Sequence, residues 1–188
     1  MAEIVLFHHA QGLTEGVRAF AGELIANGHT VHVPDLFDGR TFDTVEAGVA
    51  HAESIGFDTV LARGVAAAER LPRRIVYAGF SLGVIPAQCL AQTREGGTGA
   101  LFFDGCLPVS EFGPWPEGVP VQIHAGADDE WFGEDLASAR ELADSVPDAA
   151  LFLYDGTEHL FADSSLASYD PDATGQLMGR VAAFLAVL

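Results

Sequence analysis

The chain is poor in basic residues and in cysteine. Its 188 residues include 9 Lys and Arg against 27 Asp and Glu, which gives a net charge of −18. Nucleic acids and anionic membrane surfaces bind clustered positive charge, so we expect neither as a partner. The two cysteines, Cys89 and Cys106, are too few for a disulfide framework or a zinc site, and we expect them to pack as small apolar side chains.

Targeting segments and long apolar runs are also missing. Residues 1–7 carry no basic region and meet His8 and His9 too early for a signal peptide, and the apolar segment 181–188 is too short to span a bilayer. These absences predict a cytoplasmic protein. The length and the apolar fraction of 49% predict a single domain, residues 1–188, with one substantial core.

Short apolar runs alternate with stretches of helical periodicity. The runs predict six strands, at residues 4–7, 30–33, 75–78, 100–103, 119–125 and 150–154. The helical patterns lie around residues 14–27, 45–55, 58–71, 84–93 and 134–145, and at the C-terminus. This alternation predicts an α/β fold with a mainly parallel central sheet and helices on both faces, whose strand ends meet at one edge and hold the site.

One motif stands between the strand predicted at 75–78 and the helix predicted at 84–93. It reads Gly79-Phe80-Ser81-Leu82-Gly83. A Gly-x-Ser-x-Gly between a strand and a helix is typical of the nucleophile elbow of the α/β-hydrolase fold. The turn strains the serine backbone, and a side chain at either glycine would collide with the neighbouring strand or helix. Ser81 is therefore the predicted nucleophile.

A serine nucleophile needs a histidine to remove its proton and a carboxylate to orient that histidine. In this fold the order along the chain is serine, acid, histidine, and only His124 and His159 follow Ser81. His124 lies inside a predicted strand and is expected in the core. His159 lies in the loop after the last strand, where the base belongs.

The acid is expected after the strand predicted at 119–125. That strand leads into Gly126-Ala127-Asp128-Asp129, and either aspartate is a candidate. A Gly-x-x-Asp spacing favours Asp129 over Asp128. Asp104, after the preceding strand, is a weaker third choice that we expect to cap or brace a turn.

The oxyanion of the tetrahedral intermediate needs backbone donors. The N–H of Leu82 should be one, and the loop 8–12 should supply the other, with Ala10 preferred and Gln11 next. Histidines at successive strand positions point to opposite faces, so His8 and His9 are not expected to share a metal ion, and we predict neither metal nor cofactor. His9 is expected to line the pocket near the nucleophile.

Five segments together resemble the dienelactone hydrolase family over nearly the whole chain. They are His9-Ala10-Gln11-Gly12, Val33-Pro34-Asp35-Leu36-Phe37, the elbow, 126–129 and 156–161. The resemblance implies a compact, cofactor-free hydrolase with a catalytic triad and little or no lid. Where dienelactone hydrolases proper carry a cysteine nucleophile and a glutamate in the first loop, this chain has Ser81 and His9.

The resemblance also bears on the substrate. The founding members hold a substrate carboxylate with two arginines, and one of those positions is Asp163 here, whereas Arg40 is the candidate for the other. Besides Arg40 and His9, the residues expected to contact substrate are Gln11 and a set of aromatic residues that would supply an apolar pocket: Phe37, Phe80, Trp131 and Phe161.

Together these patterns predict a serine hydrolase that acts on small esters, thioesters or lactones through an acyl-enzyme intermediate. Two alternatives stay open at this point. One is a non-catalytic binding protein on the same fold, and the other is an acyltransferase whose acceptor is not water. The sequence leaves the natural substrate and the choice between monomer and homodimer undecided.

Overall fold

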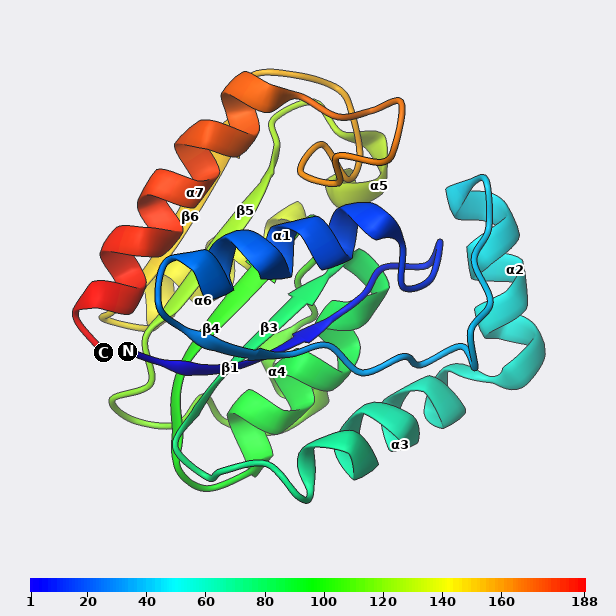
Figure 1. Cartoon of the computed structure of the whole chain (residues 1–188). Coiled ribbons are helices and arrows are strands. Elements are labelled where there is room, and N and C mark those ends of the chain that lie inside the picture. Colours follow the sequence, from blue (N-terminus) through cyan, green and yellow to red (C-terminus); the bar gives the residue numbers. More distant parts are fainter.

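The computed structural model describes residues 1–188, and its centre is one six-stranded parallel sheet (Figure 1). The strands lie in the order β2-β1-β3-β4-β5-β6, and each neighbouring pair is parallel. Their bounds are β1 Glu3–Phe7, β2 Thr30–His32, β3 Ile75–Phe80, β4 Gly97–Phe103, β5 Val121–Gly126 and β6 Ala149–Tyr154.

Helices cover both faces of the sheet. Helices α1 (Glu15–Ala26) and α7 (Pro171–Ala186) pack on one face, nearest the viewer in Figure 1. The opposite face carries α2 (Val45–Ile55), α3 (Phe57–Ala68), α4 (Val84–Thr93) and α6 (Leu136–Ser145). The short helix α5 (Glu130–Gly133) follows β5. The structure is thus an α/β sandwich of three layers without a lid domain, which confirms the predicted fold class.

The strands are apolar throughout because both sheet faces are covered. In β1, Val5 and Phe7 point into the core beneath α3 and α4, whereas Ile4 and Leu6 point into the core beneath α1 and α7. All four side chains are fully buried. Because successive side chains of a strand point to opposite faces of the sheet, one continuous apolar run contributes side chains to both cores.

Local sequence signals fix most helix ends. Thr14 caps α1, and its side-chain oxygen accepts the Val17 N–H at 3.2 Å. Thr44 caps α2 in the same way. Asp170 caps α7, which begins with Pro171 at a position where a missing N–H costs nothing.

Two predicted boundaries are wrong. Strand β4 begins at Gly97 rather than at residue 100, because pairing with β3 extends it through a glycine-rich segment that reads as a turn. The helix predicted at 134–145 is α6, which begins two residues later at Leu136, and the short helix α5 precedes it at residues 130–133, where none is predicted. In both cases tertiary contacts override the local pattern.

The strand order changes direction between β1 and β3, since β2 lies on one side of β1 and β3 on the other. Open α/β sheets bind their ligands at such a switch point, beyond the carboxyl ends of the strands. The loops that follow β1 and β3 here are residues 8–12 and the elbow at Ser81. No helix of this structure combines the length and the apolarity needed to cross a membrane.

Candidate active site

The elbow at the end of β3 holds Ser81 in a strained conformation. Ser81 has a φ of 46°, in the left-handed region that non-glycine residues rarely occupy. The turn is tight because a Cβ on Gly79 would lie 2.2 Å from the Gly83 carbonyl oxygen, and a Cβ on Gly83 would lie 2.4 Å from the Phe7 carbonyl oxygen. Both glycines are therefore required for the elbow to close against β1.

Ser81, His159 and Asp129 form a continuous chain of hydrogen bonds. The Ser81 hydroxyl donates to His159 Nε2 at 2.9 Å, and His159 Nδ1 donates to Asp129 Oδ2 at 2.7 Å. The three residues come from loops after β3, β6 and β5, which the parallel sheet brings to one edge. Their order and geometry are those of a serine–histidine–aspartate triad.

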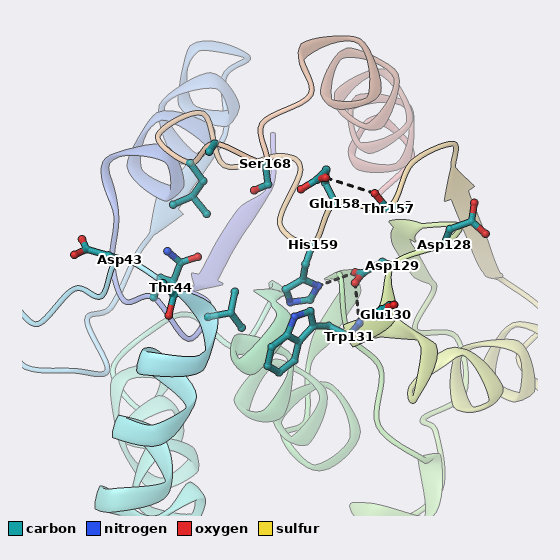
Figure 2. Close-up of a pocket in the computed structure, with 14 residues that line it drawn as sticks. Asp43, Thr44, Asp128, Asp129, Glu130, Trp131, Thr157, Glu158, His159 and Ser168 are labelled. Carbon is teal, nitrogen blue, oxygen red and sulfur yellow. Dashed lines mark hydrogen bonds and ion pairs between the residues drawn. The ribbon is translucent and has the colours of Figure 1, made fainter.

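Of the two neighbouring aspartates, the buried one contacts the histidine. Asp129 is 3% exposed, and its second oxygen, Oδ1, accepts the Trp131 N–H at 2.9 Å. Asp128 is exposed and points away from His159, whereas Trp131 lies beside the imidazole (Figure 2). The geometry thus selects Asp129 as the partner of His159.

The environment of His159 favours its protonated form. Burial by itself lowers the pKa of an imidazole, but the hydrogen bond to Asp129 and the nearby carboxylates of Asp104, Asp129 and Asp135 outweigh it and raise the His159 pKa above 6.5. A base of this kind is suited to take a proton and to carry positive charge for the lifetime of an intermediate.

The loop after β1 is fixed by its two histidines. His8 Nδ1 donates to the His9 carbonyl oxygen at 2.8 Å, and His8 Nε2 accepts the Leu36 N–H at 2.9 Å, so His8 is neutral. Burial lowers its pKa to about 4. The Gln11 N–H donates to His9 Nδ1, whereas the Ala10 N–H donates no hydrogen bond within the protein. The unpaired donor is therefore the one on Ala10.

His9 and Asp163, two of the three positions that depart from the pattern of the dienelactone hydrolase family, contact each other. His9 Nε2 donates to Asp163 Oδ2 at 2.8 Å, and both side chains are buried. Asp163 also accepts hydrogen bonds from Thr14 and Ser165. Burial by itself raises the pKa of this carboxyl, but the hydrogen bonds outweigh it and lower the pKa to about 2. The pair joins the loop after β1 to the loop that follows His159.

Asp104 does not cap or brace a turn, contrary to the sequence-based expectation. It is 3% exposed, and neither carboxylate oxygen has a hydrogen-bond partner. Its φ of 54° directs the chain out of β4 beside the elbow. The carboxyl instead lies beside the triad, with potential ligand atoms of Asp104, Asp129 and His159 all within 4.8 Å of one another.

Asp104, Asp129 and His159 form the one cluster of side chains close enough together to bind a metal ion. Both ring nitrogens of His159 are already engaged, Nδ1 by Asp129 and Nε2 by Ser81. A metal ion would have to displace one of those partners, so the arrangement fits a hydrogen-bonded triad better than a metal centre.

Two adjoining cavities open at the triad. A cavity of about 240 Å³ lies over Ser81. Its lining is mostly apolar and includes Ala10, Leu82, Val45, Val49, Leu107 and Trp131. A wider groove of about 550 Å³ continues from His159 and Trp131 toward Thr44 at the start of α2 (Figure 2).

The residues expected to contact substrate divide into two groups. Gln11 lines the groove, and Trp131 lines both cavities. His9 and Phe37 are fully buried and line neither, and Arg40 lies on the surface away from both. Phe80 and Phe161 are core residues. Sequence reasoning missed Val45 and Val49, because α2 reaches the cavity only through the tertiary fold.

A family model for the dienelactone hydrolase family matches residues 1–188. Among curated proteins, none matches the chain. Similar solved structures include a Klebsiella pneumoniae protein provisionally named dienelactone hydrolase, with 18% identity, a TM-score of 0.77, and coverage of 99% of this chain and 87% of that one.

Two further structures share the fold at comparable identity. A dienelactone hydrolase-like promiscuous phosphotriesterase from metagenomic libraries is 19% identical, with a TM-score of 0.74 and coverage of 100% of this chain and 87% of that chain. The thioesterase domain from the curacin biosynthetic pathway is 16% identical, with a TM-score of 0.65 and coverage of 96% and 90% respectively. These likenesses concern the fold.

Proposed function

Since this chain belongs to the dienelactone hydrolase family, we propose that it hydrolyses small esters, thioesters or lactones with Ser81 as nucleophile, His159 as general base and Asp129 as the orienting acid. The observation that carries the proposal is the unbroken hydrogen-bond chain from Ser81 through His159 to Asp129, beneath a cavity of about 240 Å³. A strained, partly exposed serine with an aligned base is an activated nucleophile.

In the acylation step, the Ser81 oxygen forms a bond to the acyl carbon while His159 Nε2 takes the serine proton. Asp129 holds the imidazole in the tautomer that accepts at Nε2 and stabilises the resulting cation. The tetrahedral intermediate then expels the leaving oxygen or sulfur, to which His159 returns the proton.

The N–H groups of Ala10 and Leu82 stabilise the oxyanion of this intermediate. Both residues line the cavity over Ser81, and the Ala10 N–H has no partner within the protein. The packing of α2 supports the position of Ala10, because a Cβ at Gly48 would lie 2.0 Å from the Ala10 carbonyl oxygen. A donor fixed before the substrate arrives needs no reorganisation during the reaction.

Water completes the cycle. His159 takes a proton from water, whose oxygen attacks the acyl carbon, and Ser81 leaves with the proton from His159. The wide groove supports water as the acceptor, since residues at its edge such as Asp43, Glu130 and Glu158 are exposed. An acyltransferase would instead need to exclude water from the acyl-enzyme.

The cavities also indicate a substrate class. The space over Ser81 suits a small acyl group, and no arginine or lysine lines either cavity. Four exposed carboxylates, those of Asp43, Asp128, Glu130 and Glu158, border the groove. Asp163 stands where the founding members of the family carry an arginine that holds a substrate carboxylate, and it is buried against His9. We therefore infer neutral or cationic substrates rather than anionic ones.

The substitution Ser81→Ala tests the proposal. We expect it to lower kcat/KM for an activated acetate ester at least about a thousandfold, because the acyl-enzyme can no longer form. The circular dichroism spectrum should stay unchanged, since one hydroxyl at a cavity contributes little to the core.

Ser164→Ala is the matched control, because Ser164 is exposed and its side chain makes no hydrogen bond. It should retain wild-type turnover. Full activity in Ser81→Ala would assign the nucleophile elsewhere and refute the mechanism.

A further inference from the structure

One buried carboxyl beside the triad has no partner and no role in the mechanism above. Asp104 is 3% exposed, and neither oxygen forms a hydrogen bond of normal geometry, although the Leu160 N–H lies near enough to oppose the effect of burial on the pKa of the carboxyl. Burying a carboxylate without compensation is among the most costly arrangements in a protein interior. Such a group either stays neutral or depends on a nearby positive charge.

The fold holds Asp104 at this place. Its N–H donates to the His124 carbonyl oxygen on β5 at 2.8 Å, and its φ of 54° turns the chain sharply at the end of β4. The next residue, Gly105, abuts the elbow, where a Cβ would lie 3.2 Å from the Ser81 carbonyl oxygen. The backbone at Asp104 and Gly105 thus packs closely against the backbone at Ser81.

The titratable groups that face Asp104 come from several elements around the end of β4. Asp129 and His159 come from the loops after β5 and β6, and together with Asp104 their ligand atoms lie within 4.8 Å of one another. The others are Cys106 and Asp135 on the cavity wall, and His124 and Tyr154 on β5 and β6. Of these, His124 is held neutral, because burial lowers its pKa to about 3.

Of these neighbours, only His159 can become a cation. Arg180 is the nearest basic side chain on α7, and it lies over the rings of Phe152 and Tyr154 without forming an ion pair to Asp104. Burial raises the pKa of Asp104 to about 7, against 3.8 in water. Protonated His159 is therefore the one neighbouring cation that compensates the charge of Asp104.

We propose that Asp104 is a second carboxyl of the charge system around His159, a positioning residue that stabilises the imidazolium together with Asp129. The inference rests on the proposed function, because the imidazolium forms in its acylation and deacylation steps. Asp129 orients the ring through a hydrogen bond, whereas Asp104 acts through space on the same charge.

The substitution Asp104→Asn removes the charge and keeps the shape. A neighbouring anion raises the pKa of a histidine, so its loss should lower the pKa of His159 by about one unit, measured from the imidazole C–H signals in an NMR titration. The acidic limb of kcat/KM should move to lower pH by the same amount, since activity requires neutral His159. The plateau of kcat should fall about tenfold with KM unchanged.

Thermal unfolding separates this role from a structural one. Because the Asp104 pKa is raised to about 7 in the folded state, the native protein holds the proton more tightly than the unfolded chain, and stability falls as pH rises from about 4 to about 7. Asp104→Asn should therefore raise Tm at pH 8 and leave it unchanged at pH 5. A merely structural carboxyl would give a lower Tm at both.

Asp148→Asn is the matched control, an exposed carboxyl before β6 at the opposite end of the sheet. It should leave the pKa of His159, the rate profile and Tm as they are. The double variant Asp104→Asn/Asp129→Asn should lose about a further tenfold of the activity left in Asp129→Asn, because no carboxylate then compensates the imidazolium.

An unchanged His159 pKa in Asp104→Asn would overturn the inference, and so would a raised KM with an unchanged pH profile, which would make Asp104 a substrate contact. Because the NMR titration needs no turnover, it distinguishes the two failures. A wild-type protein that does not hydrolyse esters refutes the proposed function, whatever the pKa of His159 does.

Discussion

At the scale of single residues, Asp129 connects three parts of the site. Its Oδ2 accepts a hydrogen bond from His159 Nδ1, and its Oδ1 accepts one from the Trp131 N–H at the start of α5. The carboxylate is thus held from both sides, which leaves the imidazole one orientation relative to Ser81. Trp131 then lies beside the imidazole at the mouth of the cavity.

Asp129→Asn and Asp128→Asn form a matched pair, since the residues are adjacent and only one is bonded to His159. We expect Asp129→Asn to lower kcat about ten-thousandfold, because an amide favours the wrong imidazole tautomer. Asp128→Asn should stay within about twofold of wild type. Ester-hydrolysis rates at pH 8 measure both. The reverse ranking would make Asp128 the acid.

Chain order and spacing are enough to predict which residues lie together in the structure, whereas the orientation of a side chain is not predictable from them. Ser81 and His159 are brought together as their order along the chain predicts, and the spacing after Gly126 favoured the aspartate that contacts the base. Asp104 was misread as a turn residue, because nothing local to it reveals that its carboxyl points inward beside the triad.

At the scale of elements, the loop 8–12 is held on three sides. His8 binds the backbone at Leu36, His9 binds Asp163, and Gly48 of α2 packs against the Ala10 carbonyl group. The sequence predicted the loop and the donor on Ala10 but neither contact of the histidines. The partners of His8 and His9 are 28 and 154 residues away along the chain, beyond any local pattern.

Asp163→Ala tests how much this clamp contributes. The substitution leaves His9 and Thr14 without a buried partner, so we expect a loss of about 2–4 kcal/mol in the free energy of unfolding at pH 7. The kcat should fall as well, since the Ala10 N–H is less well fixed. Urea unfolding and ester turnover measure the two effects.

The contribution of Asp163 to the free energy of unfolding is lost at low pH. The pKa of Asp163 is lowered to about 2 in the folded protein, so its contribution is present above about pH 4 and is lost as pH falls through 2. Asp155→Ala, an exposed neighbour of the same loop region, should leave stability and turnover unchanged. Equal stability of Asp163→Ala and wild type would contradict the clamp.

At the scale of the whole molecule, the parallel sheet and the net charge act together. The sheet brings the loops after β1, β3, β5 and β6 to one edge, and carboxylates border the groove there, in a chain of net charge −18 that contains no lysine. Fold class was predictable because six apolar runs alternate with helical periods. The start of β4 and the short helix α5 were not predictable, because sheet pairing and packing decide them.

The charge of the whole surface predicts substrate selectivity. At low ionic strength, we expect kcat/KM for a singly anionic ester to be about tenfold below that of a neutral ester of equal size and reactivity, with a cationic ester at or above the neutral one. In about 0.5 M salt the differences should shrink, because screening shortens the range of the field.

The double variant Glu130→Gln/Glu158→Gln tests whether carboxylates of the groove cause this selectivity. Asp148→Asn again serves as the distant control. Only the first should narrow the gap between anionic and neutral esters. Preference for the anionic ester would place a cationic contact in the site and refute the inferred substrate class.

The most direct test of the account is labelling of the intact protein with a fluorophosphonate, followed by mass spectrometry of proteolytic peptides. An activated serine attacks phosphorus and keeps the adduct. We predict one adduct per chain, on Ser81, that is absent in Ser81→Ala and lost or strongly slowed in His159→Ala. A folded protein that takes no adduct, or takes it at another serine, would contradict the triad and leave a binding protein as the better reading of this fold.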